Sequence, residues 1–179
     1  MRKARFKEFM SWCTAPQRIC WAVAEHDGKR SICPLGWHMW ASFVPPMVAI
    51  AIGPDRFTYQ LLKPAGEFVL AWPGPELADA TLKCGTESGR DFDKFAACGL
   101  TTLPATTVKT PLVAECLANL ECQVRGELVA GDHVVVTAEV VGYWLKADGP
   151  ARLLCQVNDD PAYTCLAGKG PFRLGMAKG

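Results

Sequence analysis

The stretch between residues 118 and 145 restricts the fold more than any other part of this chain. Apolar and polar residues alternate over positions 120–125, a period of two that is typical of a strand with one buried face. Gly131-Asp132 then supplies a turn signal, and a more continuously apolar run follows from 133 to 145. Two strands joined by so short a connection pair antiparallel, so we expect a hairpin. The apolar face would hold Leu120, Cys122 and Val124, and the polar face Glu121, Gln123 and Arg125.

Three further segments have the composition of strands. Residues 18–25 and 47–53 are apolar runs bounded by turn signals, and residues 66–72 form another β-compatible run. Strand signals therefore dominate both ends of the main part of the chain. A closed barrel would remove the exposed edges of such a sheet.

Short helices are expected between the strands. Asp55 can cap a helix that runs through Lys63 and ends at Pro64 and Gly66. A second helix is expected over 75–85, and a third over 90–99. The fold class is therefore mainly β, a β-barrel with short helices.

Length and charge limit the classes of function. At 179 residues the chain fits one domain, and its net charge of +1 predicts no nucleic-acid partner. No apolar run approaches the roughly 18 residues of a membrane span. The basic residues at positions 2–7 are not followed by the apolar core of a secretory signal. We expect a protein of the cytoplasm, with a core at about 15–145 and a C-terminal extension at 150–179 of irregular structure.

The nine cysteines do not form a metal-binding pattern. Their count is odd and no two have the C-x-x-C spacing, and the three histidines show no ligand spacing either. Most of the cysteines lie within apolar runs. We interpret them as small buried residues of a reducing compartment and expect no metal site.

Two segments could bind an anion. Ser88, Gly89 and Arg90 precede an expected helix start, where free backbone amides favour negative charge, and Lys94 can add a second cation. Arg56 stands in the first turn of the preceding helix. The alternative for both segments is an ordinary capped helix with solvated charges.

An aromatic segment could bind a planar ligand. Trp37, Trp40 and Phe43 stand among small residues just before an apolar strand. Aromatic residues of this kind more often belong to a core. The segment alone therefore decides nothing.

Taken together and in order, these segments resemble the flavin reductase-like family of FMN-binding split barrels, in particular its flavoredoxin-like branch. The resemblance covers about two thirds of the chain, and its most specific string is C-G-T-E-S-G-R-D-F-D-K-F at 84–95. The other matching blocks are S-I-C-P-L-G-W-x-x-W-A-S-F-V-P-P at 31–46, I-G-P-D-R-F-T-Y-Q-L-L-K at 52–63, G-E-F-V at 66–69, G-L-T at 99–101, E-C-Q-V at 121–124 and G-D-H at 131–133.

The resemblance implies a split β-barrel of Greek-key type that forms a homodimer and holds FMN near the subunit interface. It places two segments beside the flavin ring and a third set of residues around the phosphate. The ring would lie along Ser31, Ile32, Cys33, Pro34, Leu35, Gly36 and Trp37, and near Ala41, Ser42 and Phe43. The phosphate would be held by Arg56, Thr58, Tyr59, Ser88, Gly89, Arg90 and Lys94.

Two segments depart from the family pattern. Pro34 stands where relatives usually have a threonine, so one backbone donor to the ring is absent. Pro54 and Asp55 stand where they often have a lysine and a glycine, and the Asp55 carboxylate is unfavourable near a phosphate unless it turns away to cap its helix. We expect weaker FMN binding than in relatives. Cys33 is interpreted as a packing residue, the alternative being a thiol that tunes the flavin.

The activity implied is an NAD(P)H-dependent flavin reductase, with Trp37 and His38 beside the nicotinamide. Hydride transfer between two stacked rings needs no protein nucleophile, which agrees with the absence of any catalytic triad motif. Two alternatives remain: a flavin electron carrier that serves a redox protein partner, and a barrel that has lost its flavin.

Overall fold

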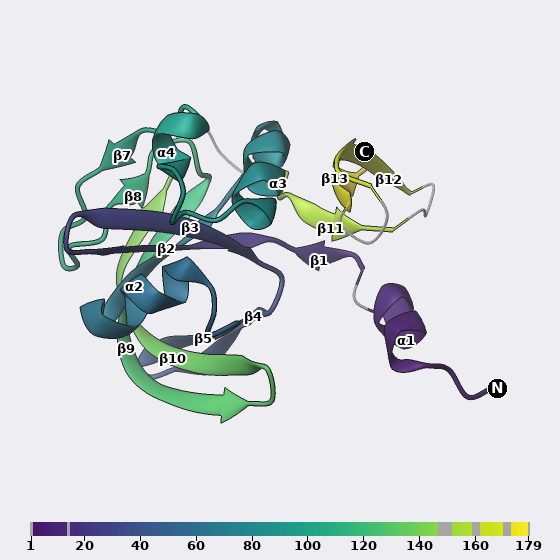
Figure 1. Cartoon of the computed structure of the whole chain (residues 1–179), viewed down its shortest axis with the longest axis horizontal. Coiled ribbons are helices and arrows are strands. Elements are labelled where there is room, and N and C mark those ends of the chain that lie inside the picture. Colours follow the sequence, from purple (N-terminus) through teal and green to yellow (C-terminus); the bar gives the residue numbers. More distant parts are fainter. Residues whose placement is uncertain (1, 14, 147–151, 159–161, 170–172, 179) are drawn as a thin grey trace.

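A seven-stranded antiparallel sheet forms the main body of the protein, and its strand order is β3-β2-β6-β9-β10-β5-β4 (Figure 1). The computed structural model describes residues 2–13, 15–146, 152–158, 162–169 and 173–178. The strands of this sheet are β2 (Cys20–His26), β3 (Lys29–Leu35), β4 (His38–Phe43), β5 (Pro46–Ile52), β6 (Glu67–Trp72), β9 (Ala118–Ala130) and β10 (His133–Leu145).

The connection between β3 and β4 shows that the sheet is rolled up. These two strands lie at opposite ends of the strand order, yet only Gly36 and Trp37 separate them in the chain. The two edges of the sheet must therefore meet at this connection. The amide of Ala51 donates to the carbonyl of Trp37 at 2.9 Å and ties the connection to β5. The expected split β-barrel of Greek-key type is thus confirmed.

The hairpin expected from the alternating pattern is also confirmed. Strands β9 and β10 pair antiparallel, and Gly131 occupies the turn with a φ of +65°, a conformation that favours glycine. Strands β2, β5 and β6 lie close to the expected segments. Strands β3 and β4 were not expected, because their residues do not alternate. Pro34 is tolerated in β3 because that strand lies at the sheet edge.

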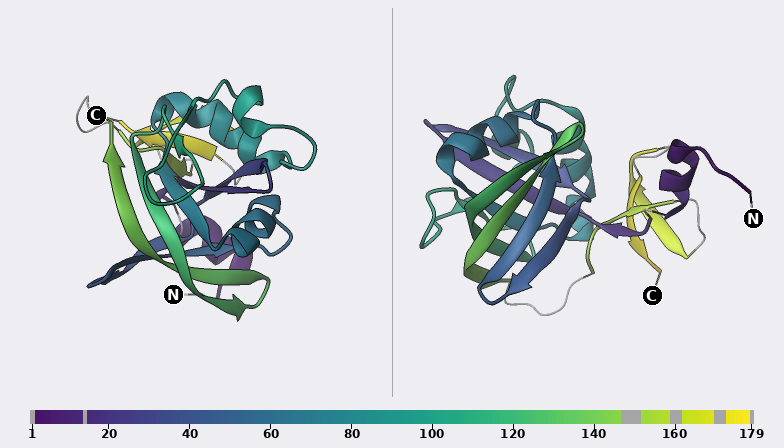
Figure 2. Two further views of the ribbon diagram at one scale, coloured as in Figure 1. Left: turned by 90° about the vertical axis from the view of Figure 1, so that its left-hand side faces the viewer. Right: turned by 90° about the horizontal axis from the view of Figure 1, so that it is seen from below.

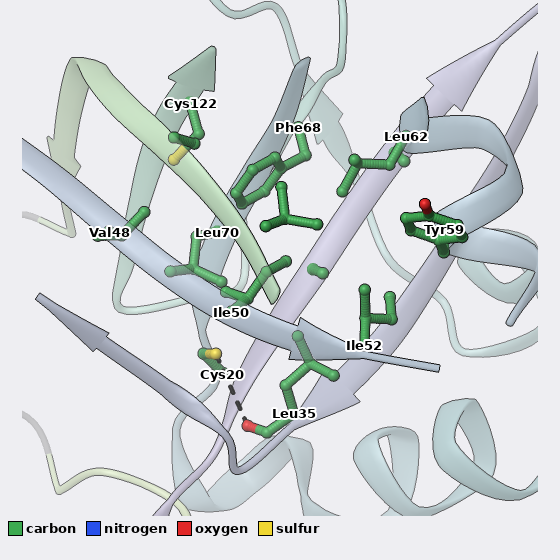
Figure 3. Close-up of a cluster of buried hydrophobic side chains, with 14 of the residues drawn as sticks. Cys20, Leu35, Val48, Ile50, Ile52, Tyr59, Leu62, Phe68, Leu70 and Cys122 are labelled. Carbon is green, nitrogen blue, oxygen red and sulfur yellow. Dashed lines mark hydrogen bonds between the residues drawn. The ribbon is translucent and has the colours of Figure 1, made fainter. Parts of the chain in front are cut away.

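The core consists of two hydrophobic clusters on the two faces of the sheet. Figure 3 shows the cluster inside the barrel, where Phe68 and Leu70 of β6 meet Ile50 of β5 and Cys122 of β9. The second cluster lies under the helices and includes the fully buried Trp21. Strand β2 sends alternate residues into each cluster, which explains why its sequence is apolar without interruption.

Helix α2 (Phe57–Ala65) begins later than expected. Arg56, not Asp55, occupies the N-cap position, and no side chain caps the helix, so the expected capping role of Asp55 is wrong. The Asp55 carboxylate lies over Gly53 instead, so close that a side chain there would collide with it. Gly66, with a φ of +68°, ends the helix after Pro64 has been accommodated in its last turn.

The second and third helices are each shorter or more divided than expected. The second is a 3₁₀ turn, η1 (Pro75–Leu77), followed by α3 (Ala78–Thr86). The third, α4, contains only Lys94–Ala97. Its N-cap is Asp93, which accepts from the amide of Phe95 at 2.9 Å and pairs with Arg30 at 2.7 Å. Because Asp93 is held in this way, the chain turns at residues 88–92 rather than forming helix.

The C-terminal part forms a second, four-stranded sheet of order β1-β11-β13-β12. The expectation of irregular structure at 150–179 is wrong for the described residues; positions 150–151, 159–161, 170–172 and 179 of this range lie outside them. The short strands pair with the N-terminal chain, and Leu154 and Leu174 bury their side chains in the second core cluster. The strands are β1 (Gln17–Arg18), β11 (Cys155–Val157), β12 (Tyr163–Ala167) and β13 (Arg173–Ala177).

This smaller sheet and α1 (Phe6–Cys13) lie together at one end of the molecule, beside the barrel (Figure 2). The remaining strands, β7 (Thr102–Leu103) and β8 (Leu112–Val113), form a two-stranded ribbon. Among the residues that the structure describes, no helix is long and apolar enough to cross a membrane.

Candidate functional site

A cavity of about 670 Å³ lies between β3, the start of α2, α3 and the smaller sheet. Its walls contain both apolar and polar side chains. From the barrel side it is lined by Ser31, Cys33, Pro34, Leu35, Gly36, Trp37, Ile52, Gly53, Asp55, Arg56, Phe57, Thr58 and His133. From the other side it is lined by Gln17, Ile19, Thr81, Leu82, Cys84, Gly85, Thr86, Glu87, Ser88, Gly89, Arg90, Lys94, Gln156 and Leu174.

The polar end is built by close packing of the 88–90 turn against β3. A Cβ added to Gly89 would lie 2.4 Å from the hydroxyl of Ser31, so only glycine allows this approach. The hydroxyl of Thr58 donates to that of Ser31 at 3.0 Å, which leaves the Ser31 hydrogen available to another acceptor. The turn itself is closed by Ser88, whose hydroxyl accepts from the amide of Arg90 at 3.3 Å.

Two exposed arginines stand at this end of the cavity. The guanidinium of Arg90 donates to the carbonyl of Asp55 at 2.9 Å and lies 5.3 Å from the centre of the Phe57 ring. That contact fixes it over the start of α2. Arg56 occupies the N-cap of the same helix. Both arginines therefore stand at the start of α2, where backbone amides lack helical partners.

Lys94 is buried, unlike the arginines, and connects three elements. Its ammonium group donates to the carbonyl of Ile32 at 2.8 Å and to that of Cys84 at 2.5 Å. Burial lowers the pKa of this lysine. Since two of its N–H groups are used within the protein, one remains that can face the cavity.

The other end of the cavity is formed by residues 33–37 and by the turn between β9 and β10. The rings of Trp37 and His133 lie 4.8 Å apart and are tilted by 44°. The imidazole of His133 also contacts the carboxylate of Asp132 at 2.7 Å. Burial raises the pKa of the Cys33 thiol, which favours its neutral form.

Several residues expected at the site lie elsewhere. Ile32 is fully buried beneath the cavity, and its part in the site is the carbonyl that binds Lys94. Tyr59 points into the barrel core, and its hydroxyl donates to Glu127 at 3.1 Å. The ring of His38 packs edge-on against a tryptophan of β6 and bonds a main-chain carbonyl, outside the cavity lining.

Residues 41–43 lie on β4, the outer strand, and do not line this cavity. Phe43 is 91% exposed and Val44 is 92% exposed. A single copy of the chain therefore leaves this apolar strand open to solvent.

Sequence reasoning missed the side of the cavity formed by the smaller sheet. Gln17, Gln156 and Leu174 reach it from strands whose pairing joins the two ends of the chain, and Ile19 reaches it from the position after β1. No local pattern predicts such a pairing. His133 was noticed only within the G-D-H block, and its place beside Trp37 depends on barrel closure. Among the described residues, no group of three or more acidic, histidine or cysteine side chains could hold a metal ion.

Comparison with known proteins decides the family. A family model described as the flavin reductase like domain matches residues 11–162. The chain belongs to the flavin reductase-like family. A relative in Archaeoglobus fulgidus, named only as an uncharacterized protein, is 39% identical over 113 residues, which are 63% of this chain and 64% of that protein. The chain therefore matches less than two thirds of that relative's length.

Solved structures of similar fold include two that share less than a quarter of their residues with this chain. An FMN-binding protein from Thermus thermophilus, solved with bound p-hydroxybenzaldehyde, has a TM-score of 0.80 and 22% identity; the match covers 99% of this chain and 96% of that one. A flavoredoxin from Methanosarcina acetivorans has a TM-score of 0.73 and 24% identity, over 82% of this chain and 76% of that one. The match to the Thermus protein extends over nearly the whole chain, including the smaller sheet.

Proposed function

We propose that this member of the flavin reductase-like family holds FMN in the cavity and transfers hydride from NAD(P)H to the flavin. The observation that carries the proposal is the polarity of the cavity, with cations and hydroxyls at one end and a strand edge with Trp37 at the other. FMN has the same polarity, with a phosphate at one end and a flat ring at the other. The match with an FMN-binding Thermus structure supports the choice of this flavin.

The residues at the polar end fit a phosphate. Ser31 has a hydroxyl hydrogen to donate, Arg56 and Arg90 supply charge, and Lys94 has one N–H left. The absence of a side chain at Gly89 lets the 88–90 turn lie directly against Ser31 at this end of the cavity. Charge-assisted hydrogen bonds of this kind are about twice as strong as neutral ones. Tyr59 is not included, because its hydroxyl is bonded to Glu127 of β9 and its side chain does not line the cavity.

The carboxylate of Asp55, at the polar end of the cavity, reduces the attraction for a phosphate. Asp55 lines the cavity and does not cap α2, so its charge stays near the proposed phosphate. Arg90 is bound to the main-chain carbonyl of Asp55 and partly offsets that charge. We therefore propose that FMN binds more weakly than in relatives that have glycine there.

The residues at the other end fit a flat ring. The backbone of 33–37 runs along the cavity wall, where its groups can bond a ring edge, except at Pro34, which has no N–H. When bound, FMN would supply a ring that accepts a hydride from reduced nicotinamide. The protein would orient the two rings, and Trp37 with His133 would form the wall beside the nicotinamide. His38 is replaced in this role by His133.

We also propose that the functional unit is a homodimer. Met39 and Phe43 of β4 and Val44 in the turn after it expose apolar side chains, and isolated soluble chains rarely expose so large an apolar surface. A second copy would cover it and bring residues 41–43 toward flavin. The eight cysteines whose side chains the structure describes, all but Cys13, are free thiols, which supports a reducing compartment such as the cytoplasm.

Stopped-flow reduction of the FMN-loaded protein tests the activity. NADH or NADPH should reduce the bound flavin, and Trp37→Leu should slow this reduction at least about tenfold, as expected for loss of ring alignment. His38→Gln is the matched control and should leave the rate unchanged. If neither nicotinamide reduces the flavin while a redox protein partner does, the protein is an electron carrier instead. If no flavin binds at all, the barrel has lost its cofactor.

A further inference from the structure

A cysteine in the wall of the cavity, Cys84, lies in direct contact with a second cysteine, Cys98, behind it. The sulfur atoms of Cys84 and Cys98 are 3.9 Å apart, and the two residues are on different elements. Cys84 lies in the last turns of α3, and Cys98 is the residue that ends α4. Between them the chain forms the 88–92 turn, which contributes the polar end of the cavity. A bond between these sulfurs would therefore close a loop that contains the proposed phosphate site.

We propose that Cys84 and Cys98 form a reversible disulfide in the presence of hydrogen peroxide, and that this bond alters the polar end of the cavity. The sulfurs must approach by about 1.9 Å to reach the S–S bond length of about 2.0 Å.

The backbone at Cys98 can provide much of this movement. It lies outside the helical conformation, with φ −108° and ψ 4°, and Gly99 follows with a φ of +64°. The other end of α4 is held by the ion pair of Asp93 with Arg30 and by the buried Phe95 ring. The closing movement would thus be concentrated at the C-terminal end of the helix.

The surroundings assign a different role to each thiol. Cys98 is partly exposed, so an oxidant in solution can reach it. Cys84 is 2% exposed, and burial together with the neighbouring Cys98 thiol raises its pKa to about 12. Cys98 is therefore the residue that meets peroxide, and Cys84 is the residue that resolves the product.

The chemistry balances in two steps. Cys98 loses two electrons to hydrogen peroxide, the O–O bond breaks, and a sulfenic acid and one water form. The sulfur of Cys84 then attacks the sulfur of Cys98; the S–S bond forms, the S–O bond breaks, and the Cys84 proton leaves in a second water. A dithiol reductant reverses the change by exchange.

The disulfide would affect the cavity by displacing Lys94. Its ammonium donates to the carbonyl of Cys84, and it begins the helix that Cys98 ends. A displacement of either cysteine would therefore move or release this buried cation. This second part of the inference rests on the proposed function, because it concerns FMN affinity. The disulfide itself does not.

Peptide mapping under non-reducing conditions tests the bond. Purified protein is treated with hydrogen peroxide, free thiols are blocked, and the digest is analysed by mass spectrometry. We expect one linked peptide pair containing Cys84 and Cys98, two hydrogens lighter than the separate peptides and released by dithiothreitol. The link should be absent in Cys98→Ser and retained in Cys165→Ser, a control that removes an exposed thiol. A Cys98 that proceeds to the sulfinic acid while Cys84 remains a free thiol would overturn the proposal.

Titration with FMN tests whether the disulfide weakens FMN binding. Oxidised wild type should bind FMN at least about fivefold more weakly than reduced wild type, and the Cys98→Ser protein should show no difference after the same treatment. Equal affinities in the presence of the mapped bond would refute the coupling to the cavity. Failure of every form to bind FMN would refute the proposed function and leave the mapped disulfide standing.

Discussion

Replacing Glu121 by glutamine should destabilise the fold by about 3 kcal/mol. Strand β9 buries this carboxylate completely, although the alternating pattern placed it on the polar face. Its Oε1 accepts from the amide and hydroxyl of Thr106 and from the indole of Trp144, at 2.8–3.0 Å. Its Oε2 accepts from the amides of Thr107 and Val108, at 2.6 and 3.0 Å. The side chain thus fastens the 106–108 loop to β9 and to the end of β10.

The magnitude follows from the pKa of this group. Burial alone would raise the pKa of Glu121, but the five hydrogen bonds outweigh burial and lower it from 4.5 to about 2. This lowering of the pKa corresponds to about 3 kcal/mol in favour of the ionised form. In the glutamine variant, an NH₂ group would face two backbone donors, and each unpaired buried donor costs about 1–3 kcal/mol. The lowered pKa and the cost of unpaired buried donors therefore give similar values for the loss of stability.

Urea denaturation at pH 7 measures this cost, with Glu139→Gln as the control. Glu139 makes an ion pair with Arg125 at 2.9 Å near the surface, which should be worth less than about 1 kcal/mol. Because the folded pKa of Glu121 is depressed, its contribution is complete above pH 4.5 and disappears as the pH falls toward 2. A loss below 1 kcal/mol at pH 7, or equal losses in both variants, would refute this account of the loop.

Three further predictions concern FMN binding and the dimer. Gly89→Ala should lower FMN affinity at least about tenfold, because its Cβ would collide with the hydroxyl of Ser31; unchanged affinity in isothermal titration would contradict the packing of the turn. Tyr59→Phe should leave FMN affinity unchanged and cost about 1 kcal/mol of stability through the lost bond to Glu127, whereas a marked loss of affinity would restore the tyrosine to the phosphate site. Phe43→Asp should convert a dimer into monomers in sedimentation velocity, and a dimer that persists would place the interface elsewhere.

Much of the barrel could be predicted because its signals are local. The β9–β10 hairpin follows from an alternating run, a Gly-Asp turn and a short connection. Strand β2 was recognisable as an apolar run, although only the structure explains that both of its faces are buried. Strands β3 and β4 escaped prediction because, as the two edges of a closing sheet, they contain proline and exposed aromatic residues.

The candidate site could be predicted at its polar end better than at its ring end. The S-G-R-D string indicated Ser88, Gly89 and Arg90, and the structure brings these beside Arg56. The predicted helix cap at Asp55 was wrong because its carboxylate lies over Gly53, an effect of local packing that propensity does not contain. The side formed by the smaller sheet depends on pairing between distant ends of the chain, which no spacing within one segment can indicate.

The affinities of the protein for FMN and for riboflavin test the proposed phosphate site. Riboflavin has the same ring as FMN and lacks the phosphate. Apoprotein titrated by quenching of flavin fluorescence should bind FMN at least about tenfold more tightly than riboflavin, as expected for even one charge-assisted bond to the phosphate. Arg56→Ala and Arg90→Ala should each reduce this preference and leave riboflavin affinity unchanged. Equal affinity of the wild type for the two flavins would contradict the central claim that this cavity holds FMN by its phosphate.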